Sequence, residues 1–243
     1  MRARLDTALV ARGLAPSREK AKRLILAGAV RVDGRRAAKA SDLVNDAAAL
    51  DVEAPEKYVS RGGYKLEAAL DAFKISCKNT VCVDIGASTG GFTDCLLQRG
   101  ASRVHAVDVG KGQLAWKLRE DRRVVVHDEI NARNLAADDI GEPADIVTID
   151  VSFISLTKVL PAAANLVRRG GHLIALIKPQ FEAGSKLVKR GGVVRDPAVH
   201  ERVKQDIETF ATENLGLRVI GIIESPLLGP AGNKEFLIGL AKS

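Results

Sequence analysis

The stretch that decides the fold runs from Val81 to Gly91 and reads Val-Cys-Val-Asp-Ile-Gly-Ala-Ser-Thr-Gly-Gly. An apolar run that is interrupted by one acidic residue and followed by closely spaced glycines is typical of a buried parallel strand that turns sharply into a helix. Gly86 and Gly90 allow positive φ angles, and the first N–H groups of the next helix lack partners within it. The stretch therefore predicts a ligand-binding loop; the alternative is a loop that only connects two elements.

The glycine spacing distinguishes between cofactors. The chain has Asp-x-Gly-x-x-x-Gly, whereas a dinucleotide pyrophosphate is bound by Gly-x-Gly-x-x-Gly. Asp84 lies two positions before the first glycine, where its carboxylate could bind the cationic amino group of a ligand. S-adenosylmethionine carries such a group, and we predict it as the cofactor.

Further carboxylates follow the next predicted strands. The run 104–108 ends at Asp108, roughly twenty residues beyond the glycines, where a carboxylate can accept both hydroxyls of an adenosine ribose. The polar loop 127–133 is placed to contact an adenine, and the strand 145–150 ends at Asp150. The predicted cofactor-binding residues are Asp84, Gly86, Ala87, Ser88, Thr89, Gly90, Gly91, Asp108, Asp128 and Asp150.

Strands and helices alternate through most of the chain. Predicted strands at 81–85, 104–108, 124–126, 145–150, 173–177, 217–223 and 236–240 are separated by helices that include 92–99, 156–167 and 197–214. A Gly-rich loop runs from Gly184 to Gly192. This order predicts an α/β fold, a doubly wound and mostly parallel seven-stranded sheet of the Rossmann-like class I methyltransferase type, with its sites at the carboxyl ends of the strands.

The positive charge is concentrated at the beginning of the chain. The 243 residues carry a net charge of +7, and the first 41 hold eleven Lys and Arg against three acidic residues, a balance of +8. The remainder is nearly neutral, so contact with phosphates explains the distribution better than a uniformly solvated surface does. The predicted partner is a nucleic acid.

Composition also limits the compartment and the cofactors. The mean hydropathy is +0.01, no apolar run is long enough to cross a bilayer, and Arg2, Arg4 and Asp6 stand where a signal peptide needs an apolar stretch. We expect a cytoplasmic protein that does not bind membranes. The three cysteines have no metal-ligand spacing, so we expect them in or near the core and expect no metal site.

The basic segment has the pattern of a small helix–hairpin unit. Ser17 is a predicted N-cap, Gly28 ends the helix that follows it, and Asp33-Gly34 is a hairpin turn. In its pattern Arg-Leu-Asp, Arg-Gly-Leu, Ser-Arg-x-x-Ala and Ile-x-x-Gly-x-Val-x-Val-Asp-Gly, the segment resembles the RNA-binding domain named after ribosomal small-subunit protein S4. The alternative is a merely soluble basic face. The predicted RNA-binding residues of this segment are Arg4, Arg12, Arg18, Lys22, Arg23, Arg31, Arg35 and Arg36.

S-adenosylmethionine is a methyl donor, so we compare known motifs to infer which atom of the nucleic acid accepts the methyl group. Amino-group methylation of nucleic acids usually places Asn or Asp before Pro-Pro and an aromatic residue, but Asp150 is followed by Val-Ser-Phe. Carbon methylation of a pyrimidine usually needs Cys beside Pro, and the chain has no Pro-Cys pair. Oxygen remains, and a ribose hydroxyl needs a base or strong orientation to attack a methyl group.

Over nearly its whole length the chain resembles the TlyA family of ribosomal RNA 2′-O-methyltransferases, also called hemolysin A. The motifs that carry the resemblance are Ser60-Arg-Gly-Gly-Tyr-Lys65, Asp84-Ile-Gly-Ala-Ser-Thr-Gly-Gly-Phe-Thr93, Asp108-Val-Gly-x-Gly-Gln-Leu114, Asp150-Val-Ser-Phe-Ile-Ser155, Lys178-Pro-Gln-Phe-Glu182 and Gly229-Pro-x-Gly-Asn-x-Glu235.

The related FtsJ group uses a Lys-Asp-Lys-Glu tetrad, which by motif falls on Lys65, Asp150, Lys178 and Glu235. The resemblance implies that Lys178 is the base or activator of the 2′-hydroxyl, that Asp150 and Lys65 hold it, and that Glu235 completes the network. Phe153 is expected either to stack on a flipped nucleotide of the RNA or to pack in the core.

The predicted domains are 1–54 for RNA binding, 55–59 as a linker and 60–243 for methyl transfer. The resemblance to shorter family members implies a cytidine of large-subunit RNA as the target. Three other functions remain open at this point: a non-catalytic ribosome-assembly or RNA-binding factor, a membrane-active hemolysin and, less well matched by the glycines, a nicotinamide dehydrogenase.

Overall fold

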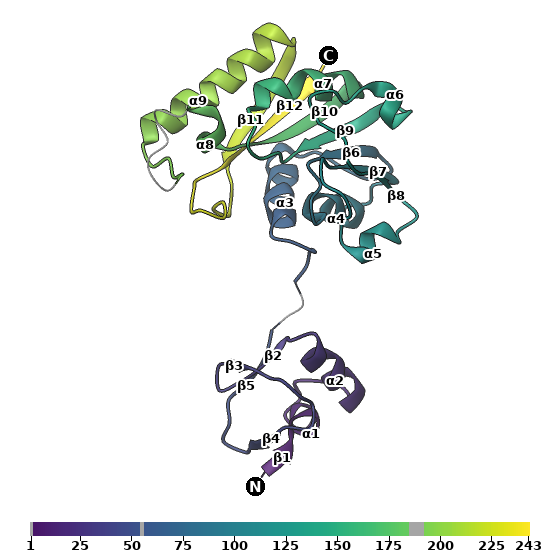
Figure 1. The fold of residues 1–243 in the computed structure, drawn as a ribbon, viewed down its shortest axis with the longest axis vertical. Helices are drawn as coiled ribbons and strands as arrows, with labels where there is room; N and C mark the ends of the chain where they lie inside the picture. Colours follow the sequence, from purple (N-terminus) through teal and green to yellow (C-terminus); the bar gives the residue numbers. More distant parts are fainter. Residues whose placement is uncertain (1, 54–55, 185–191) are drawn as a thin grey trace. The chain divides into compact units, whose positions relative to one another are not determined.

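The computed structural model describes residues 2–53, 56–184 and 192–243 (Figure 1). The chain divides into two compact units, Met1–Lys57 and Tyr58–Ser243. The predicted linker 55–59 overlaps the second unit at Tyr58, which is 2% exposed, and at Val59, whose N–H donates to Asp94 at 2.9 Å. Residue 55 and most of the predicted loop from Gly184 to Gly192 lie outside the described residues.

The first unit is a small α+β module. Its elements are β1 (Arg2–Arg4), α1 (Leu5–Ala11), α2 (Arg18–Leu26), β2 (Val30–Val32), β3 (Arg35–Arg36), β4 (Leu43–Asn45) and β5 (Leu50–Val52). Strand β1 pairs with β4, and the other three form a sheet in the order β3-β2-β5. The Ser17 side chain accepts from the Lys20 N–H at 3.2 Å, and Asp33 and Gly34 form the β2–β3 turn with φ angles of 50° and 77°. The predicted N-cap and hairpin are confirmed.

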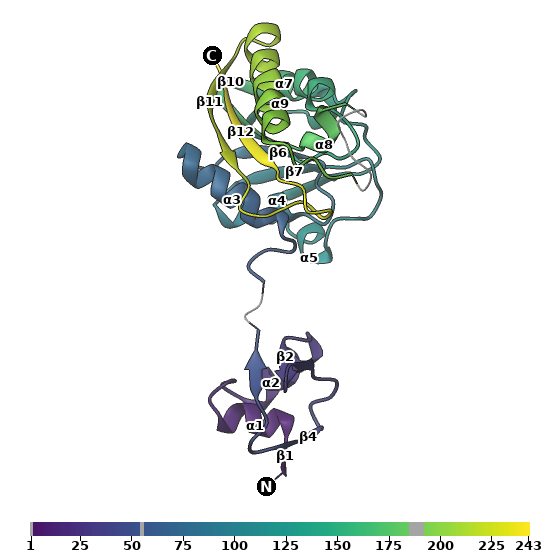
Figure 2. The ribbon, with the colours of Figure 1, turned by 90° about the vertical axis from the view of Figure 1, so that its left-hand side faces the viewer.

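The second unit contains one seven-stranded sheet in the order β11-β12-β10-β9-β6-β7-β8 (Figures 1 and 2). Its strands are β6 (Val81–Ile85), β7 (Arg103–Val107), β8 (Val124–His127), β9 (Ala144–Ile149), β10 (Val167–Ile177), β11 (Leu217–Glu224) and β12 (Phe236–Lys242). Only β12 runs antiparallel to its neighbours β10 and β11. The predicted mostly parallel, doubly wound sheet is confirmed.

Helices cover both faces of this sheet because successive residues of each strand point to opposite sides. The helices are α3 (Gly62–Phe73), α4 (Gly91–Gln98), α5 (Trp116–Arg119), α6 (Ala137–Ile140), α7 (Leu160–Leu166), α8 (Pro179–Glu182) and α9 (Pro197–Thr209). Helices α3 and α4 pack on one face, and α7 and α9 on the other (Figure 2). Val83 and Ile85 contribute to the α7–α9 core, whereas Cys82 contributes to the α3–α4 core.

Three predicted elements differ in extent from the observed ones. The segment predicted as one helix at 156–167 is a 3-10 turn, Leu156–Lys158, followed by α7, whose first turn contains Pro161. Because proline lacks an N–H group it fits only the first turn of a helix, so α7 begins there. Strand β10 begins at Val167 and includes an irregularity before His172 at Gly170-Gly171. The last predicted helix ends as the π-helical turn Phe210–Asn214.

The three cysteines lie in the second unit and are all buried. Burial raises the pKa of the Cys77 thiol to about 11 and the pKa values of Cys82 and Cys95 to about 12. The expected core location is therefore confirmed. Among the residues described, no helix is both long enough and apolar enough to cross a membrane, and no group of three or more His, Cys, Asp or Glu side chains is arranged to hold a metal ion.

Candidate active site

A cavity of about 930 Å³ opens at the carboxyl ends of β6, β9 and β10. It is lined by all four residues of the predicted tetrad: Lys65 from α3, Asp150 after β9, Lys178 after β10 and Glu235 before β12. These residues are distant in the sequence, and the sheet order brings them together. The volume lies within the range of small-molecule sites, roughly 300–1,000 Å³.

The four side chains form two ion pairs. Lys65 Nζ lies 2.5 Å from Glu235 Oε2, and the two side chains are 10% and 1% exposed. Lys178 Nζ lies 2.6 Å from Asp150 Oδ1 and also donates to Ser152 Oγ at 2.9 Å. Buried charges are costly unless they are paired, so each lysine is retained in the cavity wall together with its own carboxylate.

Glycines let the first turns of α3 and α4 approach each other. A Cβ atom at Gly91 would lie 2.2 Å from Ser60 Oγ and 2.9 Å from the backbone nitrogen of Gly63, and one at Gly63 would lie 2.2 Å from the Tyr58 ring. Larger residues would push the two helices apart. The Ser60-Arg-Gly-Gly-Tyr-Lys65 motif thus places Lys65 beside the glycine loop.

The loop between β6 and α4 forms another wall of the cavity. Gly86 and Gly90 have φ angles of 84° and 99°, and a Cβ atom at Gly86 would lie 2.4 Å from the carbonyl oxygen of Asp150. Only glycine fits this contact, so the backbone of the loop lies directly against the end of β9. Six of the ten predicted cofactor residues line the cavity: Gly86, Ala87, Ser88, Thr89, Gly91 and Asp150.

Asp84 does not line the cavity. It is completely buried beneath the loop, where its carboxylate accepts from Thr93 Oγ1 at 2.7 Å and from Thr148 Oγ1 at 2.9 Å. Burial raises the pKa of Asp84 to about 6, although the two hydroxyl donors lower it. Gly90 also lies away from the cavity, since a Cβ atom there would lie 2.3 Å from Leu118 Cδ1. These two residues support the loop from below.

Asp108 and Asp128 are directed toward backbone N–H groups. Asp108 accepts from the N–H groups of Ser88 at 2.8 Å and Gly110 at 2.7 Å. Asp128 accepts from the Gly112 N–H at 3.1 Å and from Arg119 at 2.8 Å, and the Arg119 hydrogen bond lowers the pKa of Asp128. Both carboxylates therefore brace the loops after β6 and β7, and neither lines the cavity. Their contact with a nucleoside stays a prediction.

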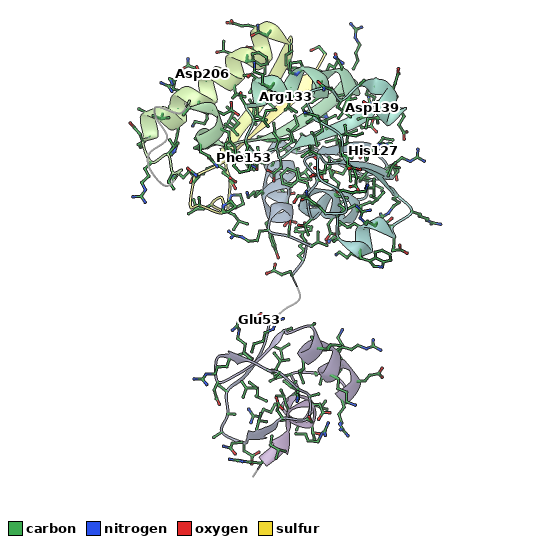
Figure 3. All side chains as sticks on the ribbon, viewed as in Figure 1. Glu53, His127, Arg133, Asp139, Phe153 and Asp206 are labelled. Carbon is green, nitrogen blue, oxygen red and sulfur yellow. The ribbon has the colours of Figure 1, made fainter. Side chains whose placement is uncertain are left out.

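Phe153 lies at the cavity with its side chain in solvent. Its side chain, labelled in Figure 3, is 89% exposed. Phe153 has a φ angle of 62°, and its ring centroid is 5.1 Å from that of Phe181. A positive φ is strained for a bulky residue and needs support from neighbouring contacts. Of the two expected locations, the core is thus wrong, and an aromatic ring is available at the opening.

Sequence reasoning did not select several residues of the cavity. Ser152 and Phe181 belong to quoted motifs and could have been found there. Asn233 is 1% exposed; it accepts from the Val194 N–H at 2.9 Å and donates to the Gly192 carbonyl at 2.8 Å. Asn233 thereby fixes the turn before Glu235, and it too belongs to a quoted motif, Gly229-Pro-x-Gly-Asn-x-Glu235, where it could have been found.

Most predicted RNA-binding residues of the first unit already have partners. Arg4 and Arg18 bind Asp6 at 3.1 and 3.2 Å. Arg12 donates to the carbonyls of residues 45, 46 and 48, and Arg36 to those of residues 27 and 28. Arg23 pairs with Glu19, and Arg31 with Glu53. Within the described ranges, the side chains of Lys22 and Arg35 make neither a hydrogen bond nor an ion pair.

Comparison with known proteins assigns both units. The FtsJ-like methyltransferase family matches residues 58–242, and the S4 domain family matches residues 3–48. The chain is 49% identical over 241 residues to the protein of Mycobacterium tuberculosis named 16S/23S rRNA (cytidine-2′-O)-methyltransferase TlyA, covering 98% of this chain and 90% of that protein.

Two further relatives agree with this assignment. A Bacillus subtilis protein described as a candidate rRNA methyltransferase, YqxC, is 49% identical over 98% of this chain and 85% of its own length. A solved structure from Streptococcus thermophilus, described as a candidate hemolysin, has a TM-score of 0.76 and 43% identity, covering 100% of this chain and 89% of that one. The chain belongs to the TlyA family, in which an S4 domain precedes an FtsJ-like methyltransferase domain.

Proposed function

We propose that the protein transfers a methyl group from S-adenosylmethionine to the ribose 2′-hydroxyl of a cytidine in ribosomal RNA, in large-subunit RNA in particular. The observation that carries the proposal is the meeting of two lysine–carboxylate pairs with the glycine loop in one cavity. The mycobacterial relative named for this reaction supports it. Because that name covers both 16S and 23S RNA, small-subunit RNA is the alternative substrate.

The residues of the loop fit the proposed cofactor. The backbone of residues 86–89 lines the cavity without side-chain obstruction at Gly86, and Asp150 adds a carboxylate beside it. We propose that these residues hold S-adenosylmethionine, with Asp108 and Asp128 binding its nucleoside. The cofactor supplies an electrophilic methyl group on a positively charged sulfur.

The tetrad would orient and activate the acceptor. Lys178 Nζ is fixed by Asp150 and Ser152, and in its neutral form it would accept the proton of the 2′-hydroxyl. Asp150 would then stabilise the resulting ammonium group through their 2.6 Å contact. The Lys65–Glu235 pair would hold the ribose from the other wall. No metal is needed for any of these roles.

The RNA would be held at two places. We propose that the S4 unit binds structured RNA through phosphates, since A-form helices hide their base edges. Phe153, exposed at the cavity, would stack on the flipped target nucleotide. An enzyme with this substrate acts in the cytoplasm, where ribosomes are assembled.

Two alternative functions have distinct signatures. A non-catalytic assembly factor would bind RNA without consuming the cofactor. A hemolysin, the description carried by the streptococcal relative, would lyse lipid membranes as a purified protein. The ion pairs in the cavity favour the enzyme over both, since neither alternative uses them.

The test is transfer of a labelled methyl group to separated ribosomal subunits and to their naked RNAs, followed by identification of the labelled nucleoside. We expect 2′-O-methylcytidine from large-subunit RNA. Lys178→Ala should fold and bind the cofactor but lower the rate by on the order of a hundredfold or more. Cofactor binding with no label in any RNA, or wild-type transfer by Lys178→Ala, would contradict the proposal.

A further inference from the structure

Glu182 joins two segments of the cavity wall. It ends α8, four residues after Lys178, and its carboxylate reaches the segment that follows β9. Glu182 Oε2 accepts from Ser155 Oγ at 2.6 Å, and Oε1 accepts from the Leu156 N–H at 2.8 Å. Both carboxylate oxygens are therefore used by residues far away in the sequence. Hydrogen bonds to a charged acceptor are stronger than neutral ones.

The segment that Glu182 holds is not fixed by the sheet. Asp150 still donates its N–H to the Ile85 carbonyl at 2.9 Å, so its backbone belongs to the ladder. The residues from 151 to 155 lie beyond the last β9–β10 pair, Ile149 with Ala175. We call residues 151–155 the aromatic loop, because Phe153 lies at its centre.

Residues 178–182 supply polar and aromatic contacts to the aromatic loop, whereas Val151 and Ile154 pack against the α7–α9 core. Lys178 holds Ser152, the Phe181 ring contacts the Phe153 ring, and Glu182 holds Ser155. Phe153 has a φ angle of 62°, a strained conformation for a bulky residue that persists only when neighbouring contacts impose it. Glu182 contributes two hydrogen bonds at the end of this loop, at 2.6 and 2.8 Å.

We infer that Glu182 is a positioning residue for methyl transfer: its carboxylate holds the aromatic loop so that Phe153 and Ser152 face the cavity beside Lys178. This inference rests on the proposed function, because it assigns Phe153 to the RNA and Ser152 to the activated lysine. Glu182 does not line the cavity itself, so it acts through the loop. The anchorage of Asp150 and of the glycine loop does not depend on it.

The experiment compares Glu182→Ala with Glu182→Gln and with Glu208→Ala, which removes an exposed carboxylate of α9 as a matched control. Using full-length protein, we measure kcat and KM with ribosomal RNA and, by calorimetry, the Kd for S-adenosylmethionine. We expect Glu182→Ala to lower kcat/KM for RNA by roughly ten- to a hundredfold, with the cofactor Kd within about twofold. Glu182→Gln should keep most of the activity, because its amide can accept from Leu156 and donate to Ser155.

A double substitution separates positioning from simple stabilisation. If Glu182 acts through Phe153, Glu182→Ala should change the KM for RNA much less in a Phe153→Ala background than in the wild type. If the effects of the two single substitutions on the KM for RNA simply multiplied in the double variant, the inference would be overturned. It would also be overturned if Glu182→Ala matched Glu208→Ala, or if cofactor affinity fell together with RNA activity.

Failure of the proposed function gives a different result. Wild-type protein that transfers no methyl group to any ribosomal RNA contradicts that function, and hydrogen exchange then still decides the role of Glu182. Glu182→Ala should lose protection of the Leu156 amide and bind RNA more weakly, whereas Glu208→Ala should do neither. Retained protection or unchanged RNA affinity in Glu182→Ala would overturn the inference.

Discussion

Each unit of the molecule buries one aspartate completely, and the two are treated in opposite ways. Asp6 in the first unit is covered by Arg4 and Arg18, and the Arg4 hydrogen bond holds the pKa of Asp6 well below its usual range. Asp84 in the second unit has two threonine hydroxyls as donors, and burial raises its pKa to about 6. Two equally buried carboxyl groups thus favour opposite protonation states: the charged form is favoured where arginines are in contact, and the neutral form where the donors are uncharged.

The same contrast applies to the cations. Surface arginines of the first unit hold its own backbone and Asp6, whereas Lys65 and Lys178 of the second unit are buried with carboxylates at the cavity. Net charge alone therefore overstates the number of groups free to bind RNA. Removing partners from these charges should reveal how much each unit depends on them.

The largest effect is expected from Glu235→Ala, which leaves Lys65 buried without its carboxylate. Breaking a buried pair in this way costs about 3–5 kcal/mol, which corresponds to a fall of roughly 10 °C in the Tm of the second unit. Lys65→Met combined with Glu235→Leu should recover most of the loss, although not the activity. Scanning calorimetry measures both variants, and a Tm within 2 °C of the wild type for Glu235→Ala would show that the pair adds nothing.

The next effect concerns Asp6→Asn in the first unit. It removes hydrogen bonds to a charged group, which are worth about 2 kcal/mol. Because the folded-state pKa of Asp6 is depressed, its contribution should be constant between pH 5 and 8 and be lost as the pH falls below the unfolded value of about 3.9. Urea unfolding across this pH range tests the expectation. Glu19→Gln, at an exposed helix pair, is the control and should stay within about 0.5 kcal/mol.

Asp84→Asn should give the opposite pH dependence in the second unit. The raised pKa means that the stability contributed by the protonated carboxyl is present below the unfolded pKa and is lost as the pH rises through 6. Relative to the wild type, Asp84→Asn should gain on the order of 1 kcal/mol between pH 5 and 7.5. The exposed Asp206→Asn is the control, and a difference independent of pH would contradict the assigned protonation.

The smallest effects separate structural from free cations in the first unit. Arg36→Ala loses two hydrogen bonds to the end of α2 and should cost about 1 kcal/mol. Lys22→Ala should change the free energy of unfolding by less than about 0.5 kcal/mol. It should weaken RNA binding, and the slope of the logarithm of RNA affinity against the logarithm of salt concentration should become shallower by roughly one. RNA affinity measured at several salt concentrations tests this. If Arg36→Ala and Lys22→Ala lost the same RNA affinity and had the same stability, the division into structural and free cations would be wrong.

The succession of strands along the chain and the glycine loop could be predicted from the sequence because both depend on local patterns, whereas the tetrad residues were implied by the family resemblance. The apolar runs, the glycine loop and the acidic strand ends are each visible within about ten residues. The partners of each charge could not be predicted, because Lys65 and Glu235 are 170 positions apart and no local rule pairs them. The direction of Asp84 was likewise hidden, since strand alternation alone does not tell which face meets a ligand and which meets Thr93.

The three buried cysteines make the protein convenient for single-molecule work. With thiol pKa values of about 11 to 12 and no exposure, Cys77, Cys82 and Cys95 form little thiolate at neutral pH and react slowly with maleimides. One cysteine introduced on each unit, for example at Glu19 and Glu208, would therefore be labelled selectively without removing the native ones. Energy transfer between the two dyes would then compare the separation of the S4 unit and the methyltransferase unit with and without added ribosomal RNA.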